Sequence, residues 1–165
     1  MCVHIVVSGC LTAVNFLARQ VRGGYFGAMT AKYALDDQVG YVLRRVTQRH
    51  MALFAQAIPE VTTQQFAVLA RLAELGPQSQ NHLGRTAAMD AATIKGVVDR
   101  LARQGLVATA ADPVDRRRLT VALSEAGQSL FRRTIAAAVQ VSRQTLEPLN
   151  AAEQALFLGL LARLA

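Results

Sequence analysis

The sequence predicts a mainly α-helical fold with one small β-hairpin, and two patterns predict it. Apolar residues recur at the three- and four-residue spacing of amphipathic helices over most of residues 36–164. The exception is residues 106–123, where two short runs of strand-forming residues flank a turn. The 165 residues, 52% of them hydrophobic and 18% charged, suffice for one domain with a core of its own.

The charge balance points to a polyanionic partner. Lys and Arg number 18 against 11 acidic residues, which gives a net charge of +7. A basic chain attracts nucleic acid or an anionic membrane surface. Beyond residues 1–18 no long apolar run occurs, which excludes a polytopic membrane protein. Two cysteines, Cys2 and Cys10, are too few for a disulfide scaffold.

Residues 1–28 differ in composition from the rest of the chain. Residues 1–18 are mostly apolar, and Arg19 and Arg22 follow them. A signal peptide carries its positive charge before the apolar run, and this run is marginal for a spanning helix. We therefore expect an extension outside the native domain, with Met29 as an alternative start and residues 29–165 as the domain. An N-terminal membrane anchor is the weaker alternative.

The first two helices of the domain have start and stop signals. Asp36 and Asp37 are suitable caps for a helix over residues 36–57, which stops before a proline. Residues 62–65, Thr-Thr-Gln-Gln, have the pattern of a capping box and predict a second helix. The Gly76-Pro77 pair ends that helix.

Two short helices, a hairpin and two longer helices follow. Ser79 caps the first short helix, and the second, residues 91–104, has apolar residues along one face. Residues 106–123 then form the hairpin, with turn-forming residues between its strands. Ser124 caps a long helix, and a capping box at residues 150–153 begins the last one.

Three helices followed by a hairpin predict a winged helix-turn-helix over residues 62–123. The helix at residues 91–104 would then lie in the major groove. Thr93 is suited to a base edge or a thymine methyl. Lys95 and Arg100 are placed for phosphates, and Gly96 permits close backbone approach. For this helix alone, an amphipathic helix with solvated charges is the alternative.

Three consecutive arginines in the hairpin favour DNA binding over that alternative. They repel one another unless an anion lies close by. A hairpin tip is narrow enough for a minor groove, where the negative potential favours arginine, and Asp115 is placed to orient one guanidinium. The predicted DNA-binding residues are therefore Ser79, Ala92, Thr93, Lys95, Gly96, Arg100, Asp115, Arg116, Arg117 and Arg118.

Residues 97–127, VVDRLARQGLVATAADPVDRRRLTVALSEAG, resemble the MarR family of bacterial transcription regulators. The matching features are Asp-Arg-Leu at residues 99–101, Asp-Pro-x-Asp-Arg-Arg at residues 112–117 and Leu-Ser-x-x-Gly at residues 123–127. The resemblance covers about residues 36–165. One departure is the turn at residues 87–90, which lacks the glycine often found there.

The resemblance implies a sequence-specific repressor of transcription that binds double-stranded DNA as an obligate homodimer. Residues 36–58 and 125–165 would be the dimerisation helices. Arg116 would enter the minor groove, and Asp115 would pair with Arg117. Independently of the resemblance, the terminal helices carry more apolar residues than the DNA-reading module could cover, and a second copy would bury them. Such a dimer predicts a pseudo-palindromic operator.

The resemblance also implies release from DNA by a small aromatic carboxylate or phenolic ligand. His50 lies on the apolar stripe of the first helix beside Arg49, and Gln65 and Phe66 begin the next helix. These four are the predicted ligand-binding residues, since they offer a cation, a donor, an amide and an aromatic wall. A core histidine with satisfied hydrogen bonds is the alternative for His50. Overall similarity favours the branch that represses nicotinate catabolism, with 6-hydroxynicotinate as the ligand.

Other functions have less support. A thiol-based redox switch needs a reactive cysteine near the dimerisation helices, but Cys2 and Cys10 lie in the extension. A winged-helix module for protein contacts alone leaves the three arginines unexplained. The histidines do not have zinc-site spacing, and no motif of an enzyme occurs. We therefore expect a regulator with no metal or cofactor, in the bacterial cytoplasm and without a membrane partner.

Overall fold

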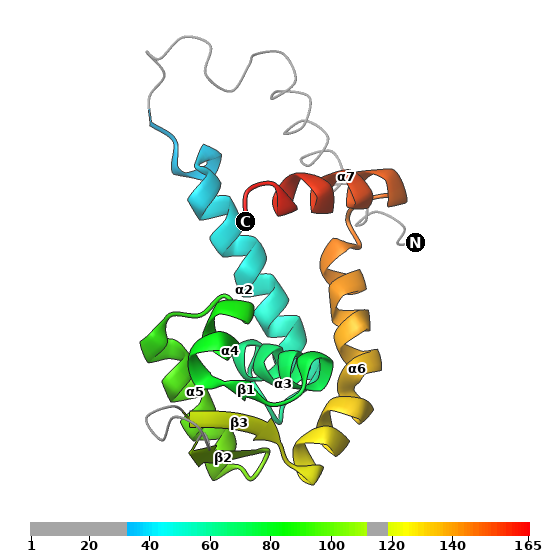
Figure 1. Cartoon of the computed structure of the whole chain (residues 1–165). Helices are drawn as coiled ribbons and strands as arrows, with labels where there is room; N and C mark the ends of the chain where they lie inside the picture. The colour runs from blue at the N-terminus through cyan, green and yellow to red at the C-terminus, as the bar shows by residue number, and fades with distance from the viewer. Residues whose placement is uncertain (1–32, 112–118) are drawn as a thin grey trace. The chain divides into compact units, whose positions relative to one another are not determined.

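The structure is a computed structural model that describes residues 33–111 and 119–165 (Figure 1). The chain divides into two units, residues 1–38 and 39–165. In the first unit the described residues contain a short 3-10 helix, η1 (Leu35–Asp37). The predicted extension of residues 1–28, with its two cysteines, lies outside the described residues.

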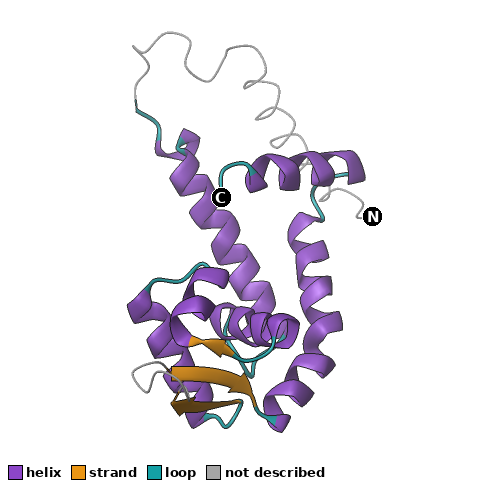
Figure 2. Cartoon of the chain, viewed as in Figure 1, coloured by secondary structure: helices purple, strands orange, loops and turns teal. Residues whose placement is uncertain are grey.

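The described part of the second unit consists of helices and a small sheet (Figure 2). This confirms the predicted mainly α-helical class. In chain order the elements are α2 (Val39–Ala57), α3 (Thr63–Leu75), β1 (Gln78–Ser79), α4 (Gln80–Thr86), α5 (Ala91–Arg103), β2 (Val107–Ala111), β3 (Leu119–Leu123), α6 (Glu125–Leu146) and α7 (Ala151–Ala162).

The sheet has one strand more than the sequence predicts. Its order is β1-β3-β2, and β2 and β3 form the predicted antiparallel hairpin, with Val107 opposite Leu123 and Ala111 opposite Leu119. The additional strand, β1, pairs antiparallel with β3 through Gln78 and Ser79. Two residues are too few to show the alternation that marks a strand in a sequence. The sequence around Gln78 therefore does not indicate a strand, and β1 is defined by its pairing with β3.

The start of the first long helix differs from the prediction. Asp36 and Asp37 lie in η1, and Gln38 has extended backbone angles, φ −83° and ψ 126°. An extended residue interrupts the helical hydrogen-bond ladder, so α2 begins only at Val39. The expectation that the two aspartates cap this helix is therefore wrong.

The other predicted helix starts are confirmed. Thr62 and Asn150 each form a capping box with the residue three positions later, Gln65 and Glu153. Ser79 and Ser124 accept hydrogen bonds from backbone N–H groups in the first turns of α4 and α6. Each cap satisfies a donor that would otherwise have no partner at a helix end.

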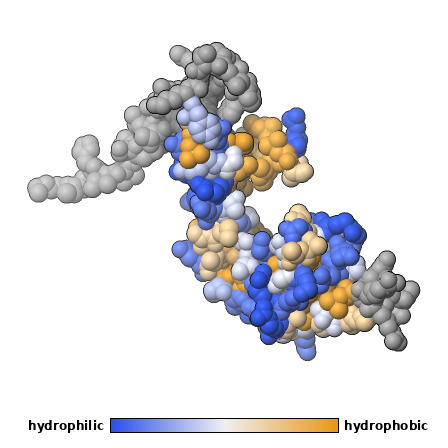
Figure 3. Space-filling model, turned by 90° about the vertical axis from the view of Figure 1, so that its left-hand side faces the viewer, coloured by the Kyte–Doolittle hydropathy of each residue, from blue (hydrophilic) through white to orange (hydrophobic). Residues whose placement is uncertain are grey.

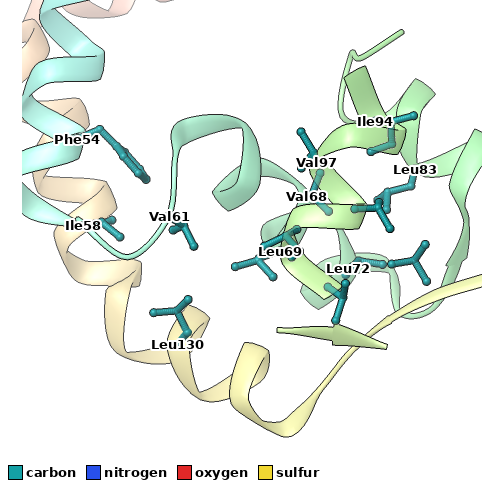
Figure 4. Close-up of a cluster of buried hydrophobic side chains, with 14 of the residues drawn as sticks. Phe54, Ile58, Val61, Val68, Leu69, Leu72, Leu83, Ile94, Val97 and Leu130 are labelled. Carbon is teal, nitrogen blue, oxygen red and sulfur yellow. The ribbon is translucent and has the colours of Figure 1, made fainter. Parts of the chain in front are cut away.

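The core lies where α3, α4 and α5 pack against the sheet and the start of α6, and it extends to the end of α2 (Figure 4). Its members include Ile58 from the loop after α2, Leu69 from α3, Leu83 from α4 and Leu101 from α5, all without exposed surface. Val121 of β3 and Leu130 of α6 close it from the other side. Together these residues give the helix-turn-helix and the sheet one shared core.

The outer helices leave large apolar side chains on the surface. In α7, no residue is buried, and Leu156 and Leu160 are 63% and 46% exposed. In α2, Val39, Val42, Leu43 and Val46 are also exposed. Figure 3 shows apolar patches among the polar residues of one face. Among the described residues, no helix combines the length and the hydropathy that crossing a membrane requires.

Candidate nucleic-acid interface

The turn between α4 and α5 is built without a glycine of its own. Ala88 adopts the left-handed backbone conformation, with φ 53°, that glycine usually supplies. The close approach of the two helices instead depends on Gly84 in α4, which is buried. A Cβ there would lie 3.2 Å from Ile94 Cγ2 and 3.2 Å from the Met89 carbonyl oxygen. The turn without a glycine is therefore accommodated by the left-handed backbone of Ala88, while Gly84 allows the two helices to pack closely.

Asp90 fixes the first turn of α5. Its Oδ1 accepts from the Thr93 backbone N–H at 2.8 Å, and its Oδ2 accepts from the Thr93 hydroxyl at 2.9 Å. These hydrogen bonds to Thr93 lower the pKa of the Asp90 carboxyl below its usual value, because they favour the charged form. The recognition helix thus begins at Ala91, as the sequence predicted.

The two faces of α5 are sharply different. Ile94, Val97, Val98 and Leu101 are spaced by three and four residues and are buried in the core. The opposite face exposes Ala92 and the charged residues Lys95, Asp99 and Arg100 to solvent. The helix is therefore held by its apolar face and presents a short-chained, basic surface outward, which suits a groove of DNA.

Two predicted DNA-binding residues of α5, Thr93 and Lys95, contact acidic side chains in the structure. The Thr93 hydroxyl donates its proton to Asp90, so the oxygen remains only as an acceptor for a base edge. Lys95 and Asp99 form an exposed ion pair at 3.3 Å. Such a pair is worth little and leaves the ammonium available to a phosphate.

The Arg100 side chain lies against Gly96. A Cβ built at Gly96 would lie 3.7 and 3.8 Å from the two terminal nitrogens of Arg100, so this side chain turns back over the glycine. These distances are ordinary van der Waals contacts, so the guanidinium would tolerate a Cβ at this position. The sequence suggested the close approach, but only the structure connects the two residues.

The remaining predicted DNA-binding residues fall into two groups. Ser79 is the cap of α4, where its Oγ accepts from the His82 N–H at 3.3 Å. Asp115, Arg116, Arg117 and Arg118 lie outside the described residues, between the paired ends of β2 and β3.

The other end of α5 is held by a pair of amides that sequence reasoning missed. The Gln65 side chain, 5% exposed, accepts from the Thr62 N–H at 2.8 Å and donates from Nε2 to Gln104 Oε1 at 3.0 Å. Gln104 is the residue that ends α5. One buried amide thus joins the start of α3 to the end of the predicted recognition helix. The capping-box pattern identified Gln65, but no local signal identifies its partner, which is 39 residues away.

Arg49 and His50, two of the predicted ligand-binding residues, contact α6. Arg49 donates to the backbone carbonyls of Gln144, at 3.1 Å, and Thr145. His50 Nδ1 lies 3.0 Å from the Thr145 hydroxyl, which itself donates to the Val141 carbonyl. Because that hydroxyl has given its proton to the carbonyl, it accepts from His50, and Nδ1 is the donor. This hydrogen bond joins α2 to α6 and gives the His50 ring a partner.

The other two predicted ligand-binding residues lie deeper in the chain. Phe66 packs between Phe54 and Phe131, with ring centroids 5.5 Å from each. Gln65 lines a cavity of about 410 Å³ between the end of α2 and the start of α3, with Gln104 at its edge. Arg49, His50 and Phe66 do not line this cavity. Of the four predicted ligand-binding residues, only Gln65 lines this cavity.

The described residues contain no group of three or more histidine, cysteine or acidic side chains placed to hold a metal ion. The candidate site consists of the capped helix α5 with its basic surface and of the strands on either side of residues 112–118.

A capped helix pair with a hairpin beside it defines a winged helix-turn-helix protein. Comparison with known proteins makes this class specific. The MarR family model matches residues 61–119. The repressor NicR of Pseudomonas putida is 41% identical over 134 residues, which cover 80% of this chain and 85% of NicR. This chain belongs to the MarR family, as the sequence motifs indicated.

Solved structures support the same assignment. A probable transcriptional regulator from Pseudomonas aeruginosa is 53% identical, with a TM-score of 0.77, over 80% of this chain and all of that chain. BpsR of Bordetella bronchiseptica, whose DNA binding is described as regulated by 6-hydroxynicotinic acid, is 38% identical with a TM-score of 0.77, over 81% of this chain and 97% of that chain. These relatives are regulators, which confirms the prediction that the chain is no enzyme.

Proposed function

We propose that this MarR-family regulator is a repressor that binds a pseudo-palindromic DNA operator as a homodimer. The observation that carries the proposal is α5, whose apolar face is locked in the core while Ala92, Lys95 and Arg100 are exposed on the outside. The caps at Asp90 and Gln104 hold both ends of this helix. A rigidly held basic helix gives DNA recognition without a cost of ordering it on binding.

The proposed homodimer uses α2, α6 and α7. The exposed apolar residues of α7 and of the first half of α2 support this, since a monomer rarely leaves such surfaces in water. A two-fold symmetric pair would place two copies of α5 on the same side of the assembly, one helical turn of DNA apart. Residues 36–58 and 125–165 are the proposed dimerisation region, and residues 62–123 are the proposed DNA-reading module.

The proposed roles in the loop between β2 and β3 come from the sequence. Arg116 enters the minor groove, where the negative potential favours a guanidinium. Asp115 and Arg117 pair and hold the loop in shape, and Arg118 adds a phosphate contact. The register of β2 and β3, which pairs Ala111 with Leu119, supports the placement of these residues at one end of the hairpin.

We further propose that a small aromatic carboxylate, 6-hydroxynicotinate, releases the repressor from DNA. Support comes from BpsR, whose DNA binding is regulated by 6-hydroxynicotinic acid, and from the contacts of His50. With Nδ1 donating to Thr145, the neutral ring keeps Nε2 as an acceptor for a ligand hydroxyl or N–H. Arg49 spends only some of its five donors on α6, so others remain for a carboxylate. A ligand there would act on the α2–α6 contact, and the partner copy would complete its site.

The decisive experiment measures fluorescence anisotropy of DNA from upstream of the gene at about 150 mM salt, with excess nonspecific competitor. Specific binding that 6-hydroxynicotinate reverses supports the whole proposal. Specific binding without release retains the repressor and removes this ligand. Binding that competitor DNA abolishes overturns the operator.

Two variants refine that experiment. We expect His50→Ala to bind the same DNA but to need more 6-hydroxynicotinate for release, whereas His82→Ala, which changes an exposed histidine of α4, keeps the wild-type release concentration. We expect Arg116→Ala to reduce the slope of log affinity against log salt by about one unit, the contribution of one phosphate contact. Arg163→Ala, at the end of α7, removes the same charge and should leave that slope unchanged.

A further inference from the structure

Ala92 lies on the outermost line of α5, directly opposite its buried face. The buried face consists of Ile94, Val97, Val98 and Leu101. Positions three and four residues apart on the other side form the outermost line, which contains Ala92, Gly96, Asp99 and Arg103. In a helix-turn-helix the N-terminal residues of the second helix meet the base edges. Ala92 is therefore the residue of this line that would meet a base first, and its side chain is a single exposed methyl group.

The hydroxyl in the first turn of α5 is not free to donate to a base. Thr93 Oγ1 donates to Asp90 Oδ2 at 2.9 Å, and the Thr93 backbone N–H donates to Asp90 Oδ1 at 2.8 Å. The Thr93 oxygen is thereby left as an acceptor. Guanine presents two acceptors in the major groove, N7 and O6, and an acceptor on the protein cannot recognise them. Hydrogen bonding by this turn therefore does not select guanine.

The long basic side chains of α5 make their contacts one turn or more beyond Ala92. Lys95 pairs with Asp99 at 3.3 Å, and the terminal nitrogens of Arg100 lie 3.7 and 3.8 Å from a Cβ built on Gly96. Both cations remain exposed, which suits contacts with the phosphates along the groove. Such contacts position the helix but contain no information about the sequence of the DNA. The interaction that remains at Ala92 is contact between apolar atoms.

We infer that Ala92 is a specificity-determining residue, which recognises thymine by contact between its own methyl group and the C5-methyl group of the base. Thymine is the base that presents a methyl group in the major groove, and alanine is one of the side chains suited to it. The inference rests on the proposed DNA reading by α5 and adds a base identity to it. Each half-site of the operator then contains a thymine opposite Ala92.

The test measures fluorescence anisotropy with the full chain and operator DNA in which uracil replaces one thymine at a time, in both half-sites. Uracil keeps the hydrogen-bonding groups of thymine and lacks only the C5-methyl group. We expect one symmetric pair of positions at which uracil weakens wild-type binding by about threefold or more per half-site, because an apolar contact is lost. At the same positions, 5-methylcytosine should bind more tightly than cytosine.

Two alanine variants assign the methyl contact to a residue. Ala92→Gly should bind the thymine and uracil operators equally. Ala91→Gly is the matched control, since it makes the same change in the same turn at the same cost in helix propensity. Ala91 precedes Ile94 and Val98 by three and seven residues, so it lies nearer the buried side of the helix, and this variant should keep the wild-type ratio of the two affinities. A general loss of stability weakens binding to both operators and leaves this ratio unchanged.

Two outcomes would overturn the role of Ala92 and leave the operator proposal intact, because binding still resists competitor DNA in both. An operator on which no uracil substitution weakens wild-type binding removes the methyl contact altogether. A thymine-to-uracil ratio that is kept in Ala92→Gly but lost in Thr93→Ser, which retains the hydroxyl and removes the methyl group, assigns the contact to Thr93. Binding that competitor DNA abolishes overturns the operator proposal, and the inference falls with it.

Discussion

The helix-turn-helix with its sheet and the outer helices differ in how far they bury their apolar side chains. In the first region, Leu69, Leu83, Leu101 and Val121 meet in one core and none of them is exposed. In the second, α7 has no buried residue although it is the most apolar helix, and Leu156 remains 63% exposed. The helix-turn-helix and the sheet complete their core within one chain, together with the end of α2 and the start of α6. The apolar side chains of α7 stay on the surface, where the proposed second copy of the chain would cover them.

The largest expected effect comes from charging the outer helices. Leu156→Glu with Leu160→Glu would bury two carboxylates in the proposed dimer interface, at a cost of several kcal/mol. We expect sedimentation to show monomers and operator affinity to fall by about 100-fold or more. Leu75→Glu on α3 is the control, because Leu75 is 45% exposed and Leu160 is 46% exposed. A charged double variant that stays dimeric would contradict the comparison.

The next effect is expected in the closed core. Leu101→Ala should lower the free energy of unfolding by about 2–5 kcal/mol, since a cavity remains where the fully buried side chain was. Urea unfolding measures this loss, and Leu75→Ala, at an exposed position, should change stability by less than about 1 kcal/mol. Equal losses in the two variants would mean that the region is not packed as described.

A smaller effect is expected where the two regions join. The Ser124 hydroxyl donates to the Gly105 carbonyl at 2.6 Å, and a Cβ on Gly127 would collide with the backbone carbonyl of Leu106. Gly127→Ala should therefore destabilise the chain by about 1–3 kcal/mol. Thermal unfolding measures this loss. Gly40→Ala in α2, where a Cβ would meet no atom of the same chain, should be neutral or stabilising in that experiment.

The smallest effect concerns Asp90 and depends on pH. Hydrogen bonds to Thr93 lower the pKa of its carboxyl in the folded chain. A lowered pKa contributes stability above the unfolded pKa of about 4, and this contribution is lost as the pH falls through the folded value. Asp90→Asn should be less stable than the wild type at neutral pH, and the two should converge below about pH 4. A difference that persists at low pH would show that the carboxylate charge is not responsible.

Local patterns predicted much of this chain because helix starts are local events. Each cap joins two residues three positions apart, so a short stretch of sequence contains both partners. This is true of the capping boxes at Thr62 and Asn150 and of the caps at Ser79 and Ser124. The prediction was wrong at Asp36 and Asp37, where suitable caps precede an extended residue. It also missed β1, which exists because β3 pairs with it.

The candidate site was predicted in part for the same reason. Lys95, Gly96 and Arg100 were found from their spacing on one helix, but the turn of Arg100 over Gly96 and the capture of the Thr93 hydroxyl by Asp90 depend on rotamers. Among the predicted ligand-binding residues, spacing placed Arg49 and His50 together but not their partners on α6, 95 and 96 residues away.

By itself, the sequence determined the helix periodicity, the caps, the hairpin, the basic surface and the family, because each of these depends on residues that are neighbours in the chain or on motifs of fixed spacing. Only the tertiary structure decided that Gln65 holds Gln104, that Gly84 makes the helix-turn-helix compact, and that Arg133 pairs with Glu60. The physical reason is that these partners are far apart in the sequence and meet only when the helices and strands pack together. The spacing of residues within one element does not predict that packing.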